Sequence, residues 1–86
     1  MIKREKTAKG HIFFKVTREQ MINDIKGMGL CDNCNKPMQN GFLIPVLNSI
    51  LCDSCFPSWC ERATYYKEDE PYEIKKADYY ESLLAK

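Results

Sequence analysis

The first half of the chain carries a strand pattern followed by a helix pattern. From Gly10 onward, apolar side chains at Ile12, Phe14 and Val16 recur at every second position. A period of two is typical of a strand with one buried face. We therefore expect a short, half-buried strand here, with His11, the single histidine, on its surface side.

A short helix should follow this strand directly. Thr17 and Gln20 stand three residues apart, as in a capping box, where each side chain accepts from the other residue's backbone N–H. We expect the helix to run to about Lys26, because Gly27 and Gly29 can adopt the left-handed conformation that ends helices. Its apolar face is predicted to contain Met21, Ile22 and Ile25.

The middle of the chain predicts a β-hairpin. The apolar residues 42–46 predict one strand, residues 50–51 predict the returning strand, and Asn48-Ser49 predicts the turn between them. Pro45 has no N–H to donate to a neighbouring strand. We therefore expect this strand at a sheet edge or at a bulge.

The last third of the chain predicts two helices. After Cys55, apolar side chains at helical spacing form one stripe: Phe56, Trp59, Cys60, Ala63 and Tyr66. Pro57 is compatible with this helix, because the first turn does not use the N–H that proline lacks. In the same way, Pro71 predicts the start of a final helix over residues 71–85.

Four cysteines form two pairs with the pattern C-x2-C-x17-C-x2-C. This spacing is typical of a structural zinc site, with Cys31, Cys34, Cys52 and Cys55 as the ligands. The alternatives are two disulfides or four free thiols in a core. Four thiolates complete the tetrahedral shell of one Zn²⁺, so the metal would stabilise the fold and not catalyse a reaction.

The size of the chain strengthens the zinc prediction. A chain of 86 residues buries little apolar surface, and small domains usually need a metal or disulfides for stability. The first residues lack the apolar run of a signal peptide, so we expect a reducing cytoplasm, where thiols bind metal. Cys60, the fifth cysteine, is interpreted as a packed core thiol, with a spare ligand or reactive thiol as the alternative.

Charge is unevenly distributed along the chain. Residues 1–30 carry seven basic and three acidic groups, whereas residues 61–86 carry five basic and seven acidic groups. We expect residues 1–9 to form a basic flexible arm, with a phosphate-contacting arm as the alternative. Residues 10–86 should then form a single zinc-stabilised domain. A net charge of +1 is low for a nucleic-acid-binding domain.

The residue types favour binding over catalysis. The chain has no Gly-rich phosphate loop and no paired carboxylates suited to acid–base chemistry, so we expect no enzymatic activity. Tyrosines beside an acidic run suit a protein interface with a basic groove, the alternative being tyrosines that complete core edges. A nucleic-acid-binding zinc finger is the second functional hypothesis. The candidate partner-binding residues are Tyr65, Tyr66, Glu68, Asp69, Glu70, Tyr72, Tyr79 and Tyr80.

Residues 31–66 resemble a treble-clef zinc module: a cysteine knuckle, a β-hairpin and a second cysteine pair that opens a helix. The run also resembles half of a LIM domain, including Pro37 after the first pair and Phe56 after the last ligand. This resemblance implies one Zn²⁺ held by the four paired cysteines. A LIM domain continues into a second zinc module, whereas only Cys60 follows here. The partner specificity of LIM domains therefore does not carry over.

In size and architecture, the chain is similar to two groups of small bacterial and phage proteins. One is the Gin-type anti-sigma factors, and the other is the anti-CRISPR metalloproteins, which bind a CRISPR effector nuclease. The second likeness implies an inhibitor that acts stoichiometrically on a host protein, in the host cytoplasm if a phage encodes it. The first implies a transcription regulator of the anti-sigma type.

Overall fold

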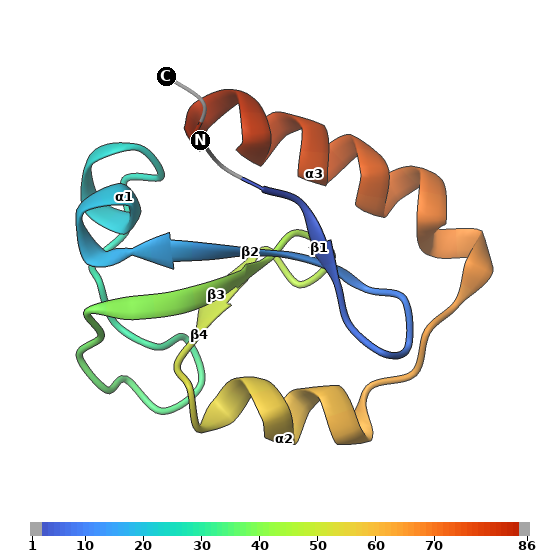
Figure 1. Cartoon of the computed structure of the whole chain (residues 1–86), viewed down its shortest axis with the longest axis horizontal. Coiled ribbons are helices and arrows are strands. Elements are labelled where there is room, and N and C mark those ends of the chain that lie inside the picture. The colour runs from blue at the N-terminus through green and yellow to red at the C-terminus, as the bar shows by residue number, and fades with distance from the viewer. Residues whose placement is uncertain (1–2, 85–86) are drawn as a thin grey trace.

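The computed structural model describes residues 3–84. Its centre is a four-stranded antiparallel sheet in the order β1-β2-β3-β4 (Figure 1). The strands are β1 (Glu5–Lys6), β2 (Ile12–Thr17), β3 (Asn40–Ile44) and β4 (Ser49–Leu51). The helices are α1 (Arg18–Asn23), α2 (Cys55–Arg62) and α3 (Glu70–Leu84), with a short 3₁₀ helix, η1 (Lys67–Asp69), before α3. The fold is therefore a small α+β fold, as the sequence predicts.

Helices cover both faces of the sheet, with α3 and α2 on opposite sides of the strands (Figure 1). Phe14 of β2 is fully buried and belongs to the same hydrophobic core as Ala77 of α3. On the other face, Phe56 of α2 lies 4.9 Å from the Phe13 ring and stacks on Phe42 at 4.1 Å between ring centroids. The core therefore has two layers, one on each side of the sheet.

The prediction of a surface position for His11 is wrong. His11 is 5% exposed, and its ring centroid lies 4.9 Å from that of Trp59 and 5.3 Å from that of Tyr65. Phe13, on the same side of the strand, is also buried. A period of two identifies a strand, but it cannot show that a helix more than forty residues away covers the second face.

Residues 3–9 lie against the rest of the fold and do not form a separate arm. β1 pairs with β2, and the Arg4 guanidinium donates a hydrogen bond of 2.8 Å to Asp78 of α3. Lys9 Nζ donates to two backbone carbonyls at the end of α2, at 2.7 and 2.6 Å. The predicted boundary at residue 10 is corrected for this segment, because β1 pairs in the sheet and Arg4 and Lys9 find acceptors on α3 and at the end of α2. Residues 1–2 lie outside the described range.

The capping box of α1 is confirmed. Thr17 is the N-cap; its hydroxyl accepts from the Gln20 N–H at 3.2 Å, and the Gln20 side chain accepts from the Thr17 N–H at 2.8 Å. The helix ends at Asn23, earlier than the predicted Lys26. Lys26 adopts a left-handed φ of 67°, so the chain reverses before Gly27.

The hairpin of β3 and β4 is confirmed, with its strands shifted relative to the prediction. β3 runs over Asn40–Ile44 and ends before Pro45, which occupies a turn closed by a 3.1 Å hydrogen bond from the Leu47 N–H to the Ile44 carbonyl. Asn48 completes the reversal with a left-handed φ of 57°. Proline fixes φ near the value that turns require, which explains why the strand stops there.

Both C-terminal helices form, with different bounds from those predicted. α2 ends at Arg62, so Tyr66 of the predicted stripe lies beyond it, in the connection to η1. α3 begins at Glu70, with Pro71 in its first turn, and extends to Leu84. The predicted end at residue 85 falls outside the described residues. Within residues 3–84, the structure contains no helix with the length and apolar character needed to cross a membrane.

Candidate metal centre

The first cysteine pair lies in a tight loop between α1 and β3. Leu30 and Pro37 form an isolated antiparallel bridge across the base of this loop. Inside it, the Cys31 N–H donates to the Lys36 carbonyl at 2.9 Å. Asn35 has a left-handed φ of 62°, which reverses the chain immediately after the second cysteine. The loop therefore presents both thiols from one turn.

Asp32 joins this loop to the hairpin. Its carboxylate accepts from the Ile50 N–H at 2.7 Å, and its own N–H donates to the Ile50 carbonyl at 2.9 Å. Ile50 belongs to β4, the strand that leads to Cys52. Asp32 therefore brings the two cysteine pairs together. Sequence reasoning missed this role, and an acid between two cysteines is the only signal that could have suggested it.

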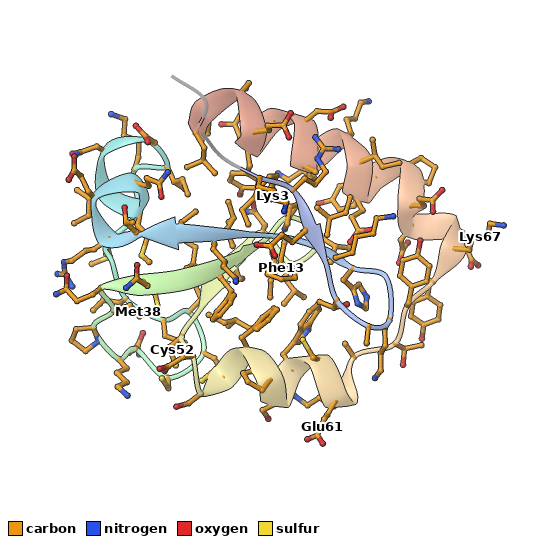
Figure 2. The ribbon with its side chains drawn as sticks, in the orientation of Figure 1. Lys3, Phe13, Met38, Cys52, Glu61 and Lys67 are labelled. Atoms are coloured by element: carbon orange, nitrogen blue, oxygen red, sulfur yellow. The ribbon has the colours of Figure 1, made fainter. Side chains whose placement is uncertain are left out.

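The second cysteine pair lies between β4 and α2. Cys52 follows the end of β4 directly, and Cys55 is the first residue of α2. The Phe56 N–H donates to the Cys52 carbonyl at 2.9 Å, which closes the turn between the two thiols. Figure 2 shows Cys52 beside the start of α2. The prediction that this pair opens a helix is confirmed.

The four paired cysteines converge on one point. The Sγ atoms of Cys31, Cys34, Cys52 and Cys55 all lie within 4.8 Å of one another. A tetrahedral ion with Zn–S bonds of about 2.3 Å sets its sulfurs about 3.8 Å apart, and the Cys34 and Cys52 sulfurs lie 3.8 Å apart. All five cysteines fall within the described residues, and all are free thiols. The cluster can therefore hold a single metal ion, and no disulfide occurs among these cysteines.

Hydrogen bonds lower the pKa of two of these thiols, Cys31 and Cys52. Burial acts to raise the pKa of Cys31, but N–H groups of Cys34, Asn33 and Cys52 oppose this effect and lower its pKa to about 6. The pKa of Cys52 is also lowered, chiefly by the N–H of Cys55 at the start of α2. Thiolates are the form that binds metal, so these donors favour a cation at the centre of the cluster.

Cys55 differs from Cys31 and Cys52, because its pKa is raised. Asn33 donates to its sulfur at 3.2 Å, which lowers its pKa, but the hydrogen bond that it shares with Cys52 and its burial raise the pKa to about 12. Cys55 therefore favours keeping its proton, whereas Cys31 favours losing its own. A divalent cation would replace the Cys55 proton and relieve the repulsion between thiolates.

Cys60 lies outside the cluster. It is half-buried on α2, and burial raises its pKa. The group of residues that could hold a metal does not include it. This position agrees with a packed thiol and not with a spare ligand.

The structure separates the candidate partner-binding residues into two groups. Tyr66, Tyr72 and Tyr79 are each more than half exposed, and Glu68 and Asp69 are also exposed. The other members make contacts within the fold.

Tyr80 is 7% exposed, and its hydroxyl donates to the side chain of Asn48, so the prediction that it faces a partner is corrected. The Tyr65 hydroxyl donates to Glu70 at 2.9 Å, and its ring packs on His11. Neighbouring residues of a helix point in different directions, so Tyr80 lies against the core while Tyr79 points outward.

No known protein family, curated protein or solved structure matches the chain. The features that carry the functional argument are therefore the cysteine cluster, the exposed tyrosines and the charges around them.

Proposed function

We propose that this protein is a protein-binding module whose fold is stabilised by one structural Zn²⁺. The single observation that carries the zinc assignment is the convergence of four cysteine sulfurs within 4.8 Å. Four thiolates without oxygen ligands favour Zn²⁺ over Mg²⁺ or Ca²⁺, which prefer oxygen. A closed shell of four protein ligands offers no position for a substrate. The proposal therefore includes no enzymatic activity.

The treble-clef assignment forms part of this proposal. The order of a cysteine loop, the β3–β4 hairpin and a second cysteine pair at the start of α2 supports it. The sheet extends beyond the hairpin, because β1 and β2 add to its β3 edge. In this proposal, residues 31–66 are a zinc module within a larger fold that also includes β1, β2, α1 and α3.

Exposed tyrosines support a protein partner. Tyr72 and Tyr79 are 52% and 55% exposed and lie seven residues apart on α3, on the same side of the helix. Tyr66, Glu68 and Asp69 add aromatic and acidic side chains close to the start of this helix. Tyrosine is common in interfaces because it offers a large contact area at low entropy cost. The acids suit a basic groove on the partner.

The N-terminal basic residues offer less to nucleic acid than their number suggests. Arg4 pairs with Asp78 and Glu81, and Lys15 lies 4.0 Å from Glu5. Lys9 is held by backbone carbonyls. Cations that already have acceptors gain less from phosphate. We therefore place a protein partner ahead of a nucleic acid and of an anti-sigma type of regulator.

The most specific form of the proposal is a stoichiometric inhibitor of the anti-CRISPR type, carried by a phage and acting on a CRISPR effector nuclease in the host cytoplasm. It rests on the resemblance in size and architecture, together with the acidic and tyrosine-rich surface. Such a surface suits the basic channel in which a nuclease holds nucleic acid.

Capture of the partner with matched variants tests the protein-binding proposal. The full-length protein is used as bait in host lysate treated with nuclease, together with Tyr79→Ala and Glu68→Lys. We expect the wild-type chain to retain a partner, and each variant to bind it about ten-fold more weakly at unchanged zinc content. The purified partner should lose activity in proportion to added protein, with an end point at one equivalent.

Met28→Ala is the matched control, because Met28 is 78% exposed and lies outside α3 and η1. It should bind the partner as the wild type does. Equal binding by all variants would place the interface elsewhere. Loss of the captured material after nuclease treatment would favour nucleic-acid binding instead.

A further inference from the structure

A small cavity lies away from the cysteine cluster, where the end of α2, the β3–β4 turn and the start of α3 meet. Its volume is about 240 Å³, below the about 300–1,000 Å³ that is usual for pockets of drug-sized ligands. Three aromatic residues line it, Trp59, Tyr65 and Tyr66, together with aliphatic side chains of the β3–β4 turn. The cavity therefore suits a single side chain or a small molecule.

Two buried polar groups also line this cavity. His11 is only 5% exposed, and its Nδ1 has no hydrogen-bond partner among the described residues. Glu73 is 2% exposed, and one of its carboxylate oxygens accepts from the Ile12 N–H at 2.9 Å. Buried polar groups in proteins are nearly always paired, so an unpaired nitrogen at a cavity wall indicates a place for a ligand group.

The charge of the cavity is negative. Glu73 and Asp69 both line it, and within residues 3–84 no ion pair involves either of them. Lys9, which reaches the backbone of the same α2 end, is occupied by two carbonyl oxygens. A buried carboxylate without a cationic partner is costly, and a cation entering the cavity would remove that cost.

The aromatic rings that line the cavity also favour a cation. The Tyr65 ring is fixed by its hydroxyl bond to Glu70 and by its edge contact with His11. The Trp59 ring also packs against His11, in a tilted geometry. Ring faces attract cations, and tryptophan attracts them most strongly. Rigid aromatic rings beside a carboxylate are the arrangement that proteins use to bind ammonium groups.

We propose that this cavity binds an alkylammonium group, with Glu73 as the counter-ion, Trp59, Tyr65 and Tyr66 as the aromatic wall, and His11 Nδ1 as a further polar contact. The alkyl chain would lie against the aliphatic side chains of the turn. A lysine side chain of a protein and a free small amine both carry this group. The inference does not depend on the proposed function, because the cavity can be tested with small probes alone.

Trp59 is the only tryptophan of the chain, so its fluorescence reports on this cavity without a label. The zinc-loaded full-length protein is titrated with n-butylammonium, and in parallel with N-butylacetamide, which keeps the chain and removes the charge. We expect a saturable change in Trp59 emission with the ammonium probe only. An equal response to both probes, or none to either, overturns the proposal.

Variants locate the binding. Glu73→Gln keeps an acceptor for the Ile12 N–H and removes the charge, so we expect binding of n-butylammonium to weaken about ten-fold or more. Tyr66→Ala removes a half-exposed wall and should weaken binding about three-fold at unchanged thermal stability, so the proposal remains testable if the first variant fails to fold. Unchanged binding by folded Glu73→Gln overturns the proposal, and so does unchanged binding by Tyr66→Ala if Glu73→Gln does not fold.

Glu61→Gln is the control variant. Glu61 lies on α2 near Trp59, but its side chain is exposed on the outer side of the helix (Figure 2). It should bind the ammonium probe as the wild type does. Equal weakening by Glu61→Gln and Glu73→Gln would show a general charge effect and would overturn the assignment to the cavity.

A last comparison separates the two sources of the group. A capped tripeptide with a central lysine and the same peptide with acetylated lysine are titrated beside n-butylammonium. Tighter binding of the lysine peptide than of the free amine identifies a protein side chain as the source. Binding of the free amine alone identifies a small molecule. Either result supports the ammonium site, and binding of the acetylated peptide as tightly as the lysine peptide contradicts it.

Discussion

At the residue scale, adjacent tyrosines on α3 have different environments. Tyr79 is 55% exposed, whereas Tyr80 is buried and donates its hydroxyl to Asn48 in the turn between β3 and β4. Residue type alone could not distinguish them, because tyrosine suits both interfaces and core edges. The difference follows from the 100° rotation per helical residue and from the position of the sheet.

Tyr80→Phe should lower the free energy of unfolding by about 0.5–1.5 kcal/mol at neutral pH, because one hydrogen bond is lost while exposed Asn48 regains water. Burial, and then the charges of Tyr79, Tyr72 and Asp32, raise the pKa of Tyr80. The neutral phenol is therefore favoured in the folded state. This contribution is complete below the unfolded pKa of about 10 and is lost as the pH rises above it.

Urea unfolding at pH 7.5 and at alkaline pH measures both effects. The wild-type chain should lose more stability than Tyr80→Phe between the two conditions. An equal loss in both proteins would mean that Tyr80 does not carry the alkaline sensitivity.

At the element scale, local signals located where helices begin better than where they end. The pair Thr17 and Gln20 fixed the start of α1, because a capping box uses only residues of one turn. The end of α1 at Asn23 could not be read in the same way, since it depends on the left-handed Lys26 and on the loop that brings Cys31 to the hairpin. In α1, the start is therefore set within one turn, whereas the end is set by the loop that follows.

Thr17→Ala should destabilise the protein by about 1 kcal/mol, because the Gln20 N–H loses its side-chain acceptor in a helix of only six residues. Thermal and urea unfolding of the zinc-loaded protein measure the change. Ser82→Ala is the comparison, since the Ser82 hydroxyl donates only to a carbonyl one turn earlier in α3. A cost for Thr17→Ala no larger than that for Ser82→Ala would contradict a contribution from the cap.

At the scale of the whole molecule, two distant chain segments meet at one cluster. The first cysteine loop and the segment from β4 to α2 contribute two sulfurs each, and Asp32 holds the loop to β4. Removal of a metal from such a site leaves neighbouring thiolates to repel one another. A chain of this size has little other apolar burial to compensate for that repulsion.

Elemental analysis of the freshly purified protein should give one zinc per chain. Cys31→Ser and chelator treatment should each release the metal and unfold the protein, because structural zinc contributes about 10–16 kcal/mol of apparent binding energy. Cys60→Ser should keep both the zinc and the circular dichroism spectrum, since Cys60 lies outside the cluster. A metal-free Cys31→Ser protein with native circular dichroism would show that fold and metal are not coupled.

The sequence by itself determined the features that depend on short spacing. It predicted the two C-x2-C pairs as one site, the capping box of α1, the hairpin, and the helices that begin at Cys55 and near Pro71. The capping box, the hairpin and the helix starts depend on residues within a few turns, so local geometry dictates them. The two cysteine pairs were predicted as one site because their spacing is typical of zinc ligands.

Only the tertiary structure decided which residues and which elements pack against each other. It buried His11 and Tyr80, joined Arg4 to α3, placed Cys60 outside the metal cluster and enclosed Glu73 in an aromatic cavity. These outcomes depend on how helices and strands distant in sequence pack together. No local pattern records that packing, because the same residue types are compatible with an exposed or a covered face until the second element is in place.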